Sequence, residues 1–591
     1  MLDVRIYRAA LVPILLAVIV CAFSLQDQPP PVTTTLAPDA FSGVRAEREL
    51  RSLAGAYPVR RAGDAADAQL ARRIADAFRG AGEAYEVTTP TFRGETIDGE
   101  RTLTTVMARQ VGAPGPELVV VAHRDAAGRG AEAELSGTAA MLELARVIAG
   151  GRLRRTVTFV STTGGSGGAA GARDLVRRLS GNTIDAVLVL GDLGSRNPRK
   201  PLSVGWSDGS RLGPLRLRRT IDEAVTSEVA TSPGAPSLAT QWTRLAFPGT
   251  VAETGPLVDS GLPAAMLSAS GERPPAADTP VDTNRVEAYG RAALRTLVAL
   301  DEGPDLHVSP TRDVVTLRKV LPPWAVRLLI GSLLLAPLLV TIDGFARVRR
   351  RHQPVTPWLG WIAAAAAPFA IAAAFATVLG VTGLLTATPP TPVPAGSIAI
   401  DGAGRAALIA TALVFALVVL ARPLVLRALG GRRRIEGPGG ATALLMVWNG
   451  LAALMWLVNP YAAGFMVPAA HLWLLVVAPG IRLRRSVALA LVALSLLPFA
   501  IGALILAGQY GFDPLGFAWA LLLAAAGGHV GPVSWLFWSI AAGCALAAAV
   551  LAWRTPRIAP PEVSESKITV RGPITYAGPG SLGGTESALR R

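Results

Sequence analysis

A histidine and an aspartate stand two positions apart at the end of an apolar run. In "VVVAHRDAAGRGAEAELSGTAAMLELARVIAG", residues 119–150, His123 and Asp125 follow a buried-strand pattern and precede a glycine-rich, acidic loop and a helix. An imidazole oriented by a nearby carboxylate is a typical metal ligand. Asp192 follows another apolar run, "AVLVL", in a similar position. These residue types at strand ends predict a cleft that either holds a metal ion or retains only the scaffold of such a site.

The stretch that must position these residues, 43–305, has a globular composition. Short β-rich runs alternate there with amphipathic helical patterns, which predicts an α/β domain with a mostly parallel sheet flanked by helices. Strands are expected at 102–109, 117–123, 155–162, 186–194 and 264–270, and helices at 65–82, 136–150, 171–179, 214–229 and 283–301. In such a sheet, ligands bind at the carboxyl ends of the strands.

The rest of the chain is apolar enough to enter a membrane. Of all residues 51% are hydrophobic and the mean hydropathy is +0.41, too high for one soluble domain. The expected order is a transmembrane anchor at 1–25, a Pro/Thr-rich linker at 26–42, the α/β domain at 43–305, a linker at 306–323, a polytopic all-α membrane domain at 324–553 and a disordered tail at 554–591. The membrane domain is expected to hold about seven spans, with 514–528 as a possible re-entrant segment.

The basic residues predict an orientation in the membrane. The formal net charge is +15, and arginines cluster in alternate loops between the expected spans while the other loops hold no Lys or Arg. The pattern predicts an integral plasma membrane protein with cytoplasmic termini and an extracytoplasmic 43–305 domain. No aromatic–basic platform accompanies the charge, so nucleic acid is not an expected partner. The preference for Arg over Lys and the abundance of Ala suggest a high-GC bacterial genome.

The 43–305 domain resembles the zinc aminopeptidase and glutamate-carboxypeptidase family, the co-catalytic di-zinc exopeptidases. The resemblance rests on "TVMA" (105–108), "VVVAHRD" (119–125), "ELSGTAAMLELAR" (134–146), "TVTFVSTTGG" (156–165), "GLPAAML" (261–267) and "DTPVDT" (278–283). It implies two zinc ions that share a bridging aspartate and polarise a scissile carbonyl. It also implies a separate glutamate that deprotonates the attacking water.

Part of the family's site is retained in this sequence. The resemblance assigns the first histidine ligand to His123, the carboxylate that orients it to Asp125, and a further ligand to Asp192. The family's last histidine ligand falls on Asp278, which is a change of ligand type. His123, Asp192 and Asp278 are therefore the vestigial candidate metal ligands. The alternative interpretation makes His123 and Asp125 a hydrogen-bonded pair at a strand end, and Asp192 a residue that caps a turn.

The positions on which the chemistry depends are lost. The bridging aspartate falls on Ala133, and the Glu-Glu pair that supplies a ligand and the general base falls on Gly165 and Ser166. Glu132 and Glu134 flank the bridging position, and in an extended loop their side chains would point in other directions. The resemblance thus predicts a fold of this family without a confident catalytic residue.

Two functions stay open, and the first is favoured. The protein is either a non-catalytic, membrane-anchored pseudopeptidase or an active metalloexopeptidase of the aminopeptidase type with an altered site that uses Glu132 or Glu134. The first needs no cofactor and the second needs zinc. Expected partners are membrane lipid and a protein, peptide or lipid-linked ligand at the cleft. A purely membrane function, with the α/β domain as a lid, is a third possibility.

Overall fold

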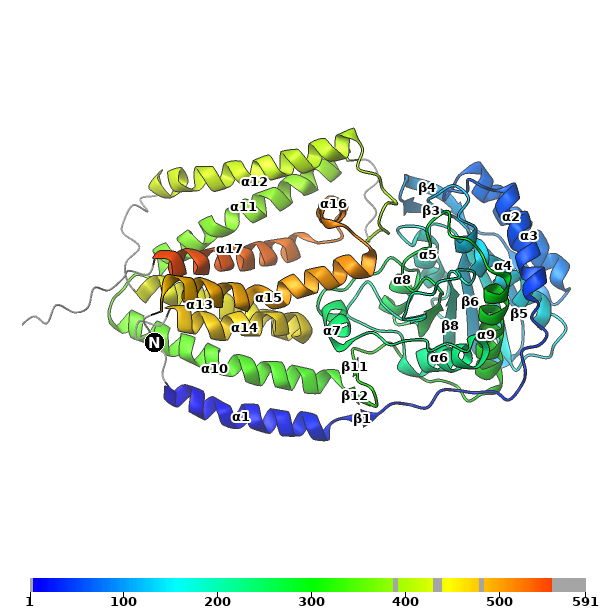
Figure 1. Ribbon diagram of the computed structural model, residues 1–591, viewed down its shortest axis with the longest axis horizontal. Coiled ribbons are helices and arrows are strands. Elements are labelled where there is room, and N and C mark those ends of the chain that lie inside the picture. Colours follow the sequence, from blue (N-terminus) through cyan, green and yellow to red (C-terminus); the bar gives the residue numbers. More distant parts are fainter. Residues whose placement is uncertain (1–3, 386–391, 429–437, 478–482, 555–591) are drawn as a thin grey trace, which may run out of the picture.

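The computed structural model describes residues 4–385, 392–428, 438–477 and 483–554. It places an α/β domain at one end of a bundle of long helices (Figure 1). The tail expected to be disordered, from residue 555 onward, and part of the arginine-rich loops lie outside the described residues.

One seven-stranded sheet forms the centre of the α/β domain. In order across the sheet its strands are β2 (Tyr85–Thr88), β5 (Val106–Gln110), β7 (Arg155–Thr162), β6 (Ala113–His123), β8 (Ile184–Leu190), β10 (Ala264–Leu267) and β9 (Ser203–Val204). The four central strands, β7, β6, β8 and β10, are parallel. The outer pairings, β2 with β5, β5 with β7 and β9 with β10, are antiparallel. The predicted α/β sheet flanked by helices is confirmed: its centre is parallel, and antiparallel pairings occur at its edges.

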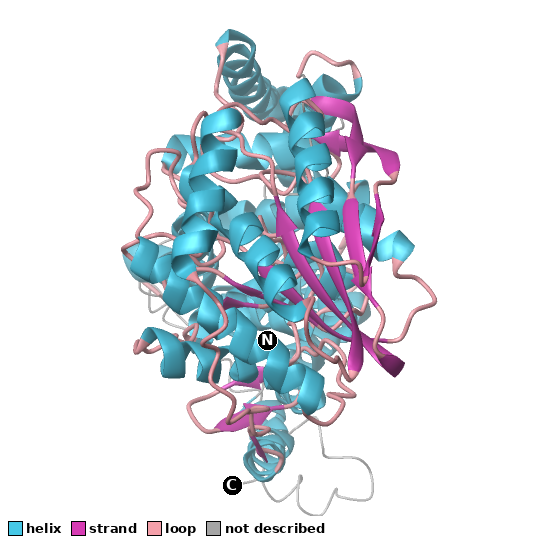
Figure 2. Ribbon diagram, turned by 90° about the vertical axis from the view of Figure 1, so that its right-hand side faces the viewer, coloured by secondary structure: helices cyan, strands magenta, loops and turns pink. Residues whose placement is uncertain are grey.

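Alternating residues of the central strands supply two hydrophobic cores. On β6, Leu118 and Val120 face one core, and Val119 and Val121 face the other. The first core includes residues of α2 (Gly43–Ala56), α3 (Ala65–Ala81), α4 (Glu132–Ile148), α6 (Leu215–Val229) and α9 (Thr283–Glu302). The second includes α5 (Ala170–Arg178), α7 (Leu238–Ala246), α8 (Thr254–Asp259) and residues of the long helices. Helices thus cover both faces (Figure 2), and the second core continues into the bundle.

Two predicted boundaries change in the structure. The strand expected at 102–109 is broken at Thr105, because β4 (Gly99–Thr104) pairs with β3 (Thr91–Thr96) in a separate hairpin and only β5 joins the sheet. The helix expected from residue 136 begins at Glu132. Glu132, Ala133 and Glu134 therefore lie in a helical turn, and the expectation of an extended loop there is wrong.

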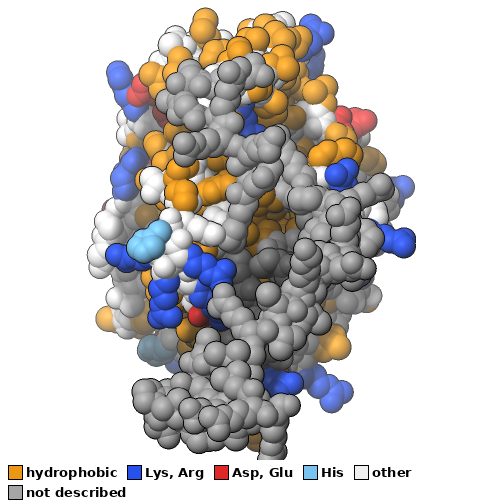
Figure 3. Space-filling model, turned by 90° about the vertical axis from the view of Figure 1, so that its left-hand side faces the viewer, with side chains coloured by type: hydrophobic (Ala, Val, Ile, Leu, Met, Phe, Trp, Pro, Cys, Tyr) orange, Lys and Arg blue, Asp and Glu red, His pale blue; other side chains and the backbone are white. Residues whose placement is uncertain are grey.

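The bundle contains long apolar helices where the sequence predicts spans. Among the described residues, eight helices are long and apolar enough to cross a membrane, and the helix at Pro514–Ala526 is shorter. The bundle helices are α1 (Val4–Phe23), α10 (Pro323–Arg350), α11 (Thr356–Val381), α12 (Gly402–Ala428), α13 (Pro438–Val458), α14 (Pro460–Val477), α15 (Arg485–Tyr510), α16 (Pro514–Ala526) and α17 (Pro532–Arg554). The end of the bundle away from the α/β domain carries Lys and Arg side chains (Figure 3).

The two expected linkers are not free segments. β1 (Gln26–Asp27) pairs antiparallel with β12 (Lys319–Leu321), which also pairs with β11 (Val314–Val315). β1 directly follows α1, and β12 directly precedes α10. These two helices pack side by side, and the Cys21 thiol of α1 donates to the Ala325 carbonyl of α10 at 3.2 Å, so the adjoining strands also meet. The 26–42 and 306–323 linkers thus share a small sheet between the membrane bundle and the α/β domain.

Candidate functional site

His123 lies at the end of β6, where the sequence predicts it. Its Nδ1 lies 3.1 Å from the backbone oxygen of Asp125 and 3.6 Å from a carboxylate oxygen of the same residue. Burial alone would lower the pKa of His123, but the hydrogen bond and charge of Asp125, with Glu134 and Glu253, outweigh it and raise the pKa to about 10. The three carboxylates around the imidazole therefore favour its protonated form.

The Asp125 carboxylate is occupied by the glycine-rich loop after β7. It accepts hydrogen bonds from the backbone N–H of Gly165 at 3.0 Å, from that of Ser166 at 3.1 Å, and from the Ser166 hydroxyl. Burial raises the pKa of Asp125, but His123 and these donors together lower it to about 2. Asp125 thus orients His123 and also fixes the loop that replaces the family's Glu-Glu pair.

The same loop leaves no room for a side chain at residue 165. A Cβ on Gly165 would lie 2.5 Å from both Cβ and Cγ of His123, which is closer than real Cβ contacts. The imidazole therefore occupies the space that a carboxylate side chain from residue 165 would need. His123 can take this position because residue 165 is a glycine and not the glutamate that the family resemblance implies.

Arg60 holds the loop that leads from β6 to α4. Its guanidinium is fully buried and donates to the backbone oxygens of Arg124 at 2.9 Å, Gly130 at 2.6 Å and Ala131 at 2.7 Å. Ala131 has a left-handed backbone with φ of 42°, and α4 starts directly after it. This fixed turn buries the methyl group of Ala133 at the position where the family has its bridging aspartate.

Asp192 is saturated by donors from its own surroundings. One carboxylate oxygen accepts from the N–H groups of Gly194 at 2.8 Å and Ser195 at 3.0 Å, and the other accepts from the hydroxyls of Ser195 and Ser270. The Ser136 hydroxyl also lies 3.5 Å from it. This is the turn-capping arrangement that the sequence offered as the alternative to a metal ligand.

Asp278 does not join His123 and Asp192. It is exposed, and it is absent from the lining of the cavity in which the other two lie. Across the described ranges, no three His, Cys, Asp or Glu side chains are grouped so that they could hold a metal ion. The one-metal site considered from these three residues is therefore not formed.

Two acids line the cavity with His123: Glu134, which the sequence offered as a candidate, and Glu253, which sequence reasoning missed. Glu134 comes from the first turn of α4, and Glu253 from the start of α8. Burial raises the pKa of Glu134 to about 7 against the charge of His123. Glu253 accepts from the Thr162 hydroxyl at 2.6 Å, while its other oxygen is buried and has no hydrogen-bond partner among the described residues. The available signal for Glu253 was "AETGPL", residues 252–257, which stands where the family that the sequence resembles has a Ser-Asp-His segment.

The cavity is small. Its volume is about 40 Å³. A water needs roughly 10–15 Å³ by the same measure, and ligand clefts usually offer several hundred. In this structure the cavity can hold a few waters but not the side chain and backbone of a peptide residue.

Comparison with known proteins places the likeness in this part of the chain. Residues 105–234, from β5 through α6, match the model of peptidase family M28. This part of the α/β domain is therefore similar to peptidase family M28. A comparison with curated proteins finds no match.

Solved structures with a similar fold include three bacterial proteins. LapB from Legionella pneumophila is 16% identical over 47% of this chain and 79% of LapB, with a TM-score of 0.37. Porphyromonas gingivalis glutaminyl cyclase is 16% identical over 44% of this chain and 99% of the cyclase, with a TM-score of 0.32. BSAP, a zinc aminopeptidase from Bacillus subtilis, is 12% identical over 44% of this chain and 94% of BSAP, with a TM-score of 0.35.

The donor set of this α/β domain does not fit a pair of zinc ions. The ligand that bridges two zinc ions must carry a negative charge, and the side chain of Ala133 carries no charge. The Asp125 and Asp192 carboxylates already accept hydrogen bonds from surrounding N–H and O–H groups. Gly165 cannot carry a side chain past His123. This arrangement therefore supports no catalytic step through zinc.

A buried ion pair joins the cavity wall to the helical bundle. The Arg244 guanidinium on α7 donates to both carboxylate oxygens of Glu272, at 2.7 and 2.8 Å, and both side chains are almost fully buried. The guanidinium also lies over the ring of Tyr510, 5.0 Å from its centroid, at the end of α15. The Tyr510 hydroxyl donates to the Gly249 carbonyl at 2.7 Å. The two loops that carry Glu272 and Gly249 are thus fixed against the bundle.

Proposed function

We propose that this protein is a membrane-anchored pseudopeptidase whose M28-type domain acts as a non-catalytic binding or scaffolding module. The observation that carries the proposal is the packing of His123 against Gly165, which uses the space that the family's carboxylates need. Ala133 and the hydrogen-bonded Asp125 and Asp192 point the same way. The partner is a protein, a peptide or a lipid-linked molecule at the extracytoplasmic side.

The proposed orientation is that of the basic loops. The described arginines Arg349 and Arg350 end α10, and Arg351 follows it directly. Arg484 and Arg485 stand at the start of α15. Both groups lie at the end of the bundle away from the M28-type domain, as positive residues on a cytoplasmic face would. This supports a plasma membrane protein with its M28-type domain outside the cytoplasm.

Metal content and peptidase activity of the full-length protein test the proposal. The protein is purified in detergent, supplied with zinc, freed of excess metal by gel filtration and analysed by elemental mass spectrometry. We expect no stoichiometric zinc and no chelator-sensitive release of N-terminal residues from a peptide library. Two zinc ions per chain together with such release would overturn the proposal, and the His123→Ala variant serves as the metal-site control.

The second candidate function is an active exopeptidase with an altered site, and Glu134 favours it over Glu132. Glu134 is buried beside His123 with its pKa raised to about 7, which suits a general base, whereas Glu132 is exposed. If the purified protein is active, the Glu134→Gln variant should lose activity while Glu132→Gln keeps it. Equal activity in both variants would remove this candidate.

A further inference from the structure

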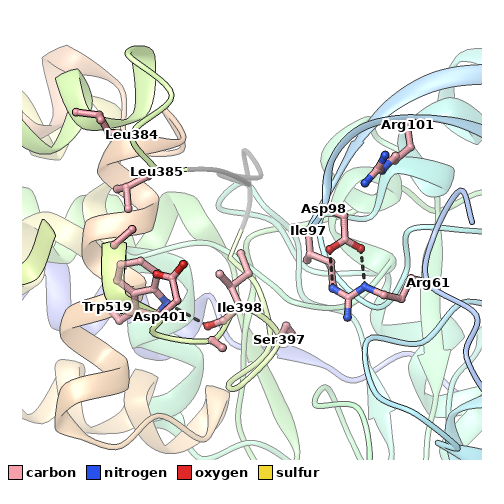
Figure 4. A pocket seen from close by; sticks show the side chains of 12 residues that line it. Arg61, Ile97, Asp98, Arg101, Leu384, Leu385, Ser397, Ile398, Asp401 and Trp519 are labelled. Carbon is pink, nitrogen blue, oxygen red and sulfur yellow. Dashed lines mark hydrogen bonds and ion pairs between the residues drawn. The ribbon is translucent and has the colours of Figure 1, made fainter. Parts of the chain in front are cut away.

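A larger cavity, of about 320 Å³, lies where the M28-type domain meets the membrane helices (Figure 4). One wall comes from the β3–β4 hairpin and the segment before α3, with Arg61, Asp98 and Arg101. The other wall comes from the end of α11, the start of α12, and α16. The cavity therefore stands at the level where bundle helices end, and it is separate from the cavity around His123.

The membrane-side wall is mostly apolar, apart from Ser397 and Asp401, and it carries an aromatic residue suited to a membrane interface. Leu384 and Leu385 follow the end of α11, and Leu384 is 65% exposed. The Trp519 indole on α16 is buried to 6% exposure, and its N–H donates to the Ile398 carbonyl at 3.1 Å. Tryptophan concentrates at the boundary between headgroups and acyl chains. The leucines of this wall are suited to contact lipid acyl chains, and Trp519 is suited to the level of the lipid headgroups.

The opposite wall is charged, and one of its charged side chains, Arg101, has no partner among the described residues. Arg61 donates to both carboxylate oxygens of Asp98 at 2.7 Å and to the Ala127 carbonyl at 2.9 Å, so these two side chains satisfy each other. Asp401, across the cavity, accepts from the Gly404 N–H at 2.7 Å and caps the first turn of α12. Within the described part of the chain, Arg101 is exposed and has no hydrogen bond or ion pair. The cavity thus presents one free guanidinium.

The hairpin is fixed in place, so the base of the Arg101 side chain has a defined position at the cavity. Ile97, at the hairpin tip, is 4% exposed and packs in one cluster with Leu385, Val393 and Trp519 of the membrane side. A Cβ on Gly63 would lie 2.8 Å from the Cβ of Arg101, so the base of the Arg101 side chain packs closely against that turn. A free cation on a fixed hairpin beside an apolar wall matches an amphipathic anion.

We propose that this cavity binds an anionic phospholipid, with the headgroup phosphate at Arg101 and the acyl chains along Leu384 and Leu385. Arginine recognises phosphate through charge-assisted hydrogen bonds. A free phosphate would use the cation but not the apolar wall, and a zwitterionic lipid would bring a second cation toward it. The lipid would hold the hairpin side of the M28-type domain at the bilayer, independently of whether the cavity around His123 has any activity.

Native mass spectrometry of the full-length protein in detergent tests the assignment with three probes: phosphatidylglycerol, phosphatidylcholine of the same acyl chains, and inorganic phosphate. We expect retained phosphatidylglycerol and about tenfold weaker retention of phosphatidylcholine. Arg101→Ala should weaken phosphatidylglycerol binding about tenfold, and Arg101→Lys should restore part of it. Arg48→Ala, which changes an exposed arginine on α2, is the matched control, and this variant should bind the lipid as the parent protein does.

Melting temperatures of all variants are measured alongside to show that they are folded. Equal retention of the two lipids would overturn the proposal, as would unchanged phosphatidylglycerol binding in folded Arg101→Ala. Displacement of the lipid by millimolar inorganic phosphate alone would overturn the lipid assignment in favour of a simple phosphate site.

Discussion

Ile97 rests directly on the backbone of Gly167: a Cβ placed on that glycine would lie 2.4 Å from Cγ2 of the isoleucine. Gly167 belongs to the loop that stands where the family has its Glu-Glu pair, and Ile97 is the hairpin residue buried against the membrane side. The loop that carries chemistry in the family thus forms, here, part of the contact between the α/β domain and the bundle. Its glycines permit this close packing on one side against His123 and on the other against Ile97.

Truncation of the isoleucine should loosen this contact. Ile97→Ala removes buried methyl groups and is expected to cost about 2–5 kcal/mol of stability. The loss should appear as faster amide hydrogen exchange in β3, β4 and the 163–168 loop. Val111→Ala, at a residue that is 64% exposed, is the control and should leave exchange unchanged. Unaltered exchange at the hairpin in Ile97→Ala would contradict the docking role.

A methyl group at residue 165 should be far more costly than one at an open glycine. Gly165→Ala places a Cβ against the His123 ring and is expected to cost about 1–3 kcal/mol through overpacking. Gly80→Ala, in α3 where a Cβ meets nothing within 4 Å, should be neutral or stabilising. Thermal unfolding in detergent compares the two, and a stable Gly165→Ala protein would show that His123 can move aside.

The stability of the domain should depend on pH through Glu134. Its pKa is raised from 4.5 to about 7 in the folded protein, so the protonated form favours folding. That contribution is fully present below pH 4.5 and is lost as the pH rises through 7. Glu134→Gln, which stays neutral, should match the parent protein near pH 4.5 and exceed it at pH 8, by up to about 3 kcal/mol. Parallel melting curves across this range would contradict the prediction.

Separation of Arg244 from Glu272 should destabilise the cavity wall. Arg244→Met leaves a buried carboxylate without its partner and is expected to cost about 3–5 kcal/mol. The double variant Arg244→Met/Glu272→Gln removes both charges and should recover part of that loss. Melting temperatures of the four proteins give the coupling energy. A double variant as unstable as the sum of the single changes would indicate that the ion pair does not fix the wall.

The sequence by itself determined the local and periodic features. Strand and helix patterns predicted the β-α order of the 43–305 domain, because burial periodicity depends only on residues close together in the sequence. The lengths of apolar runs predicted the eight long apolar helices for the same reason. The family motifs located His123, Asp125 and Asp192, and they identified Ala133 and Gly165 as departures. These conclusions need only the order and spacing of residues in one stretch.

Only the tertiary structure decided which distant residues meet. Glu134 turned toward His123 because α4 begins one turn earlier than its pattern predicts, and Asp278 stayed outside the cavity. Contacts such as Tyr510 with Gly249, or Ile97 with Gly167, join segments with no periodic signal between them. Such contacts depend on how completed elements pack together, so the steric fit that fills the site was visible only in three dimensions.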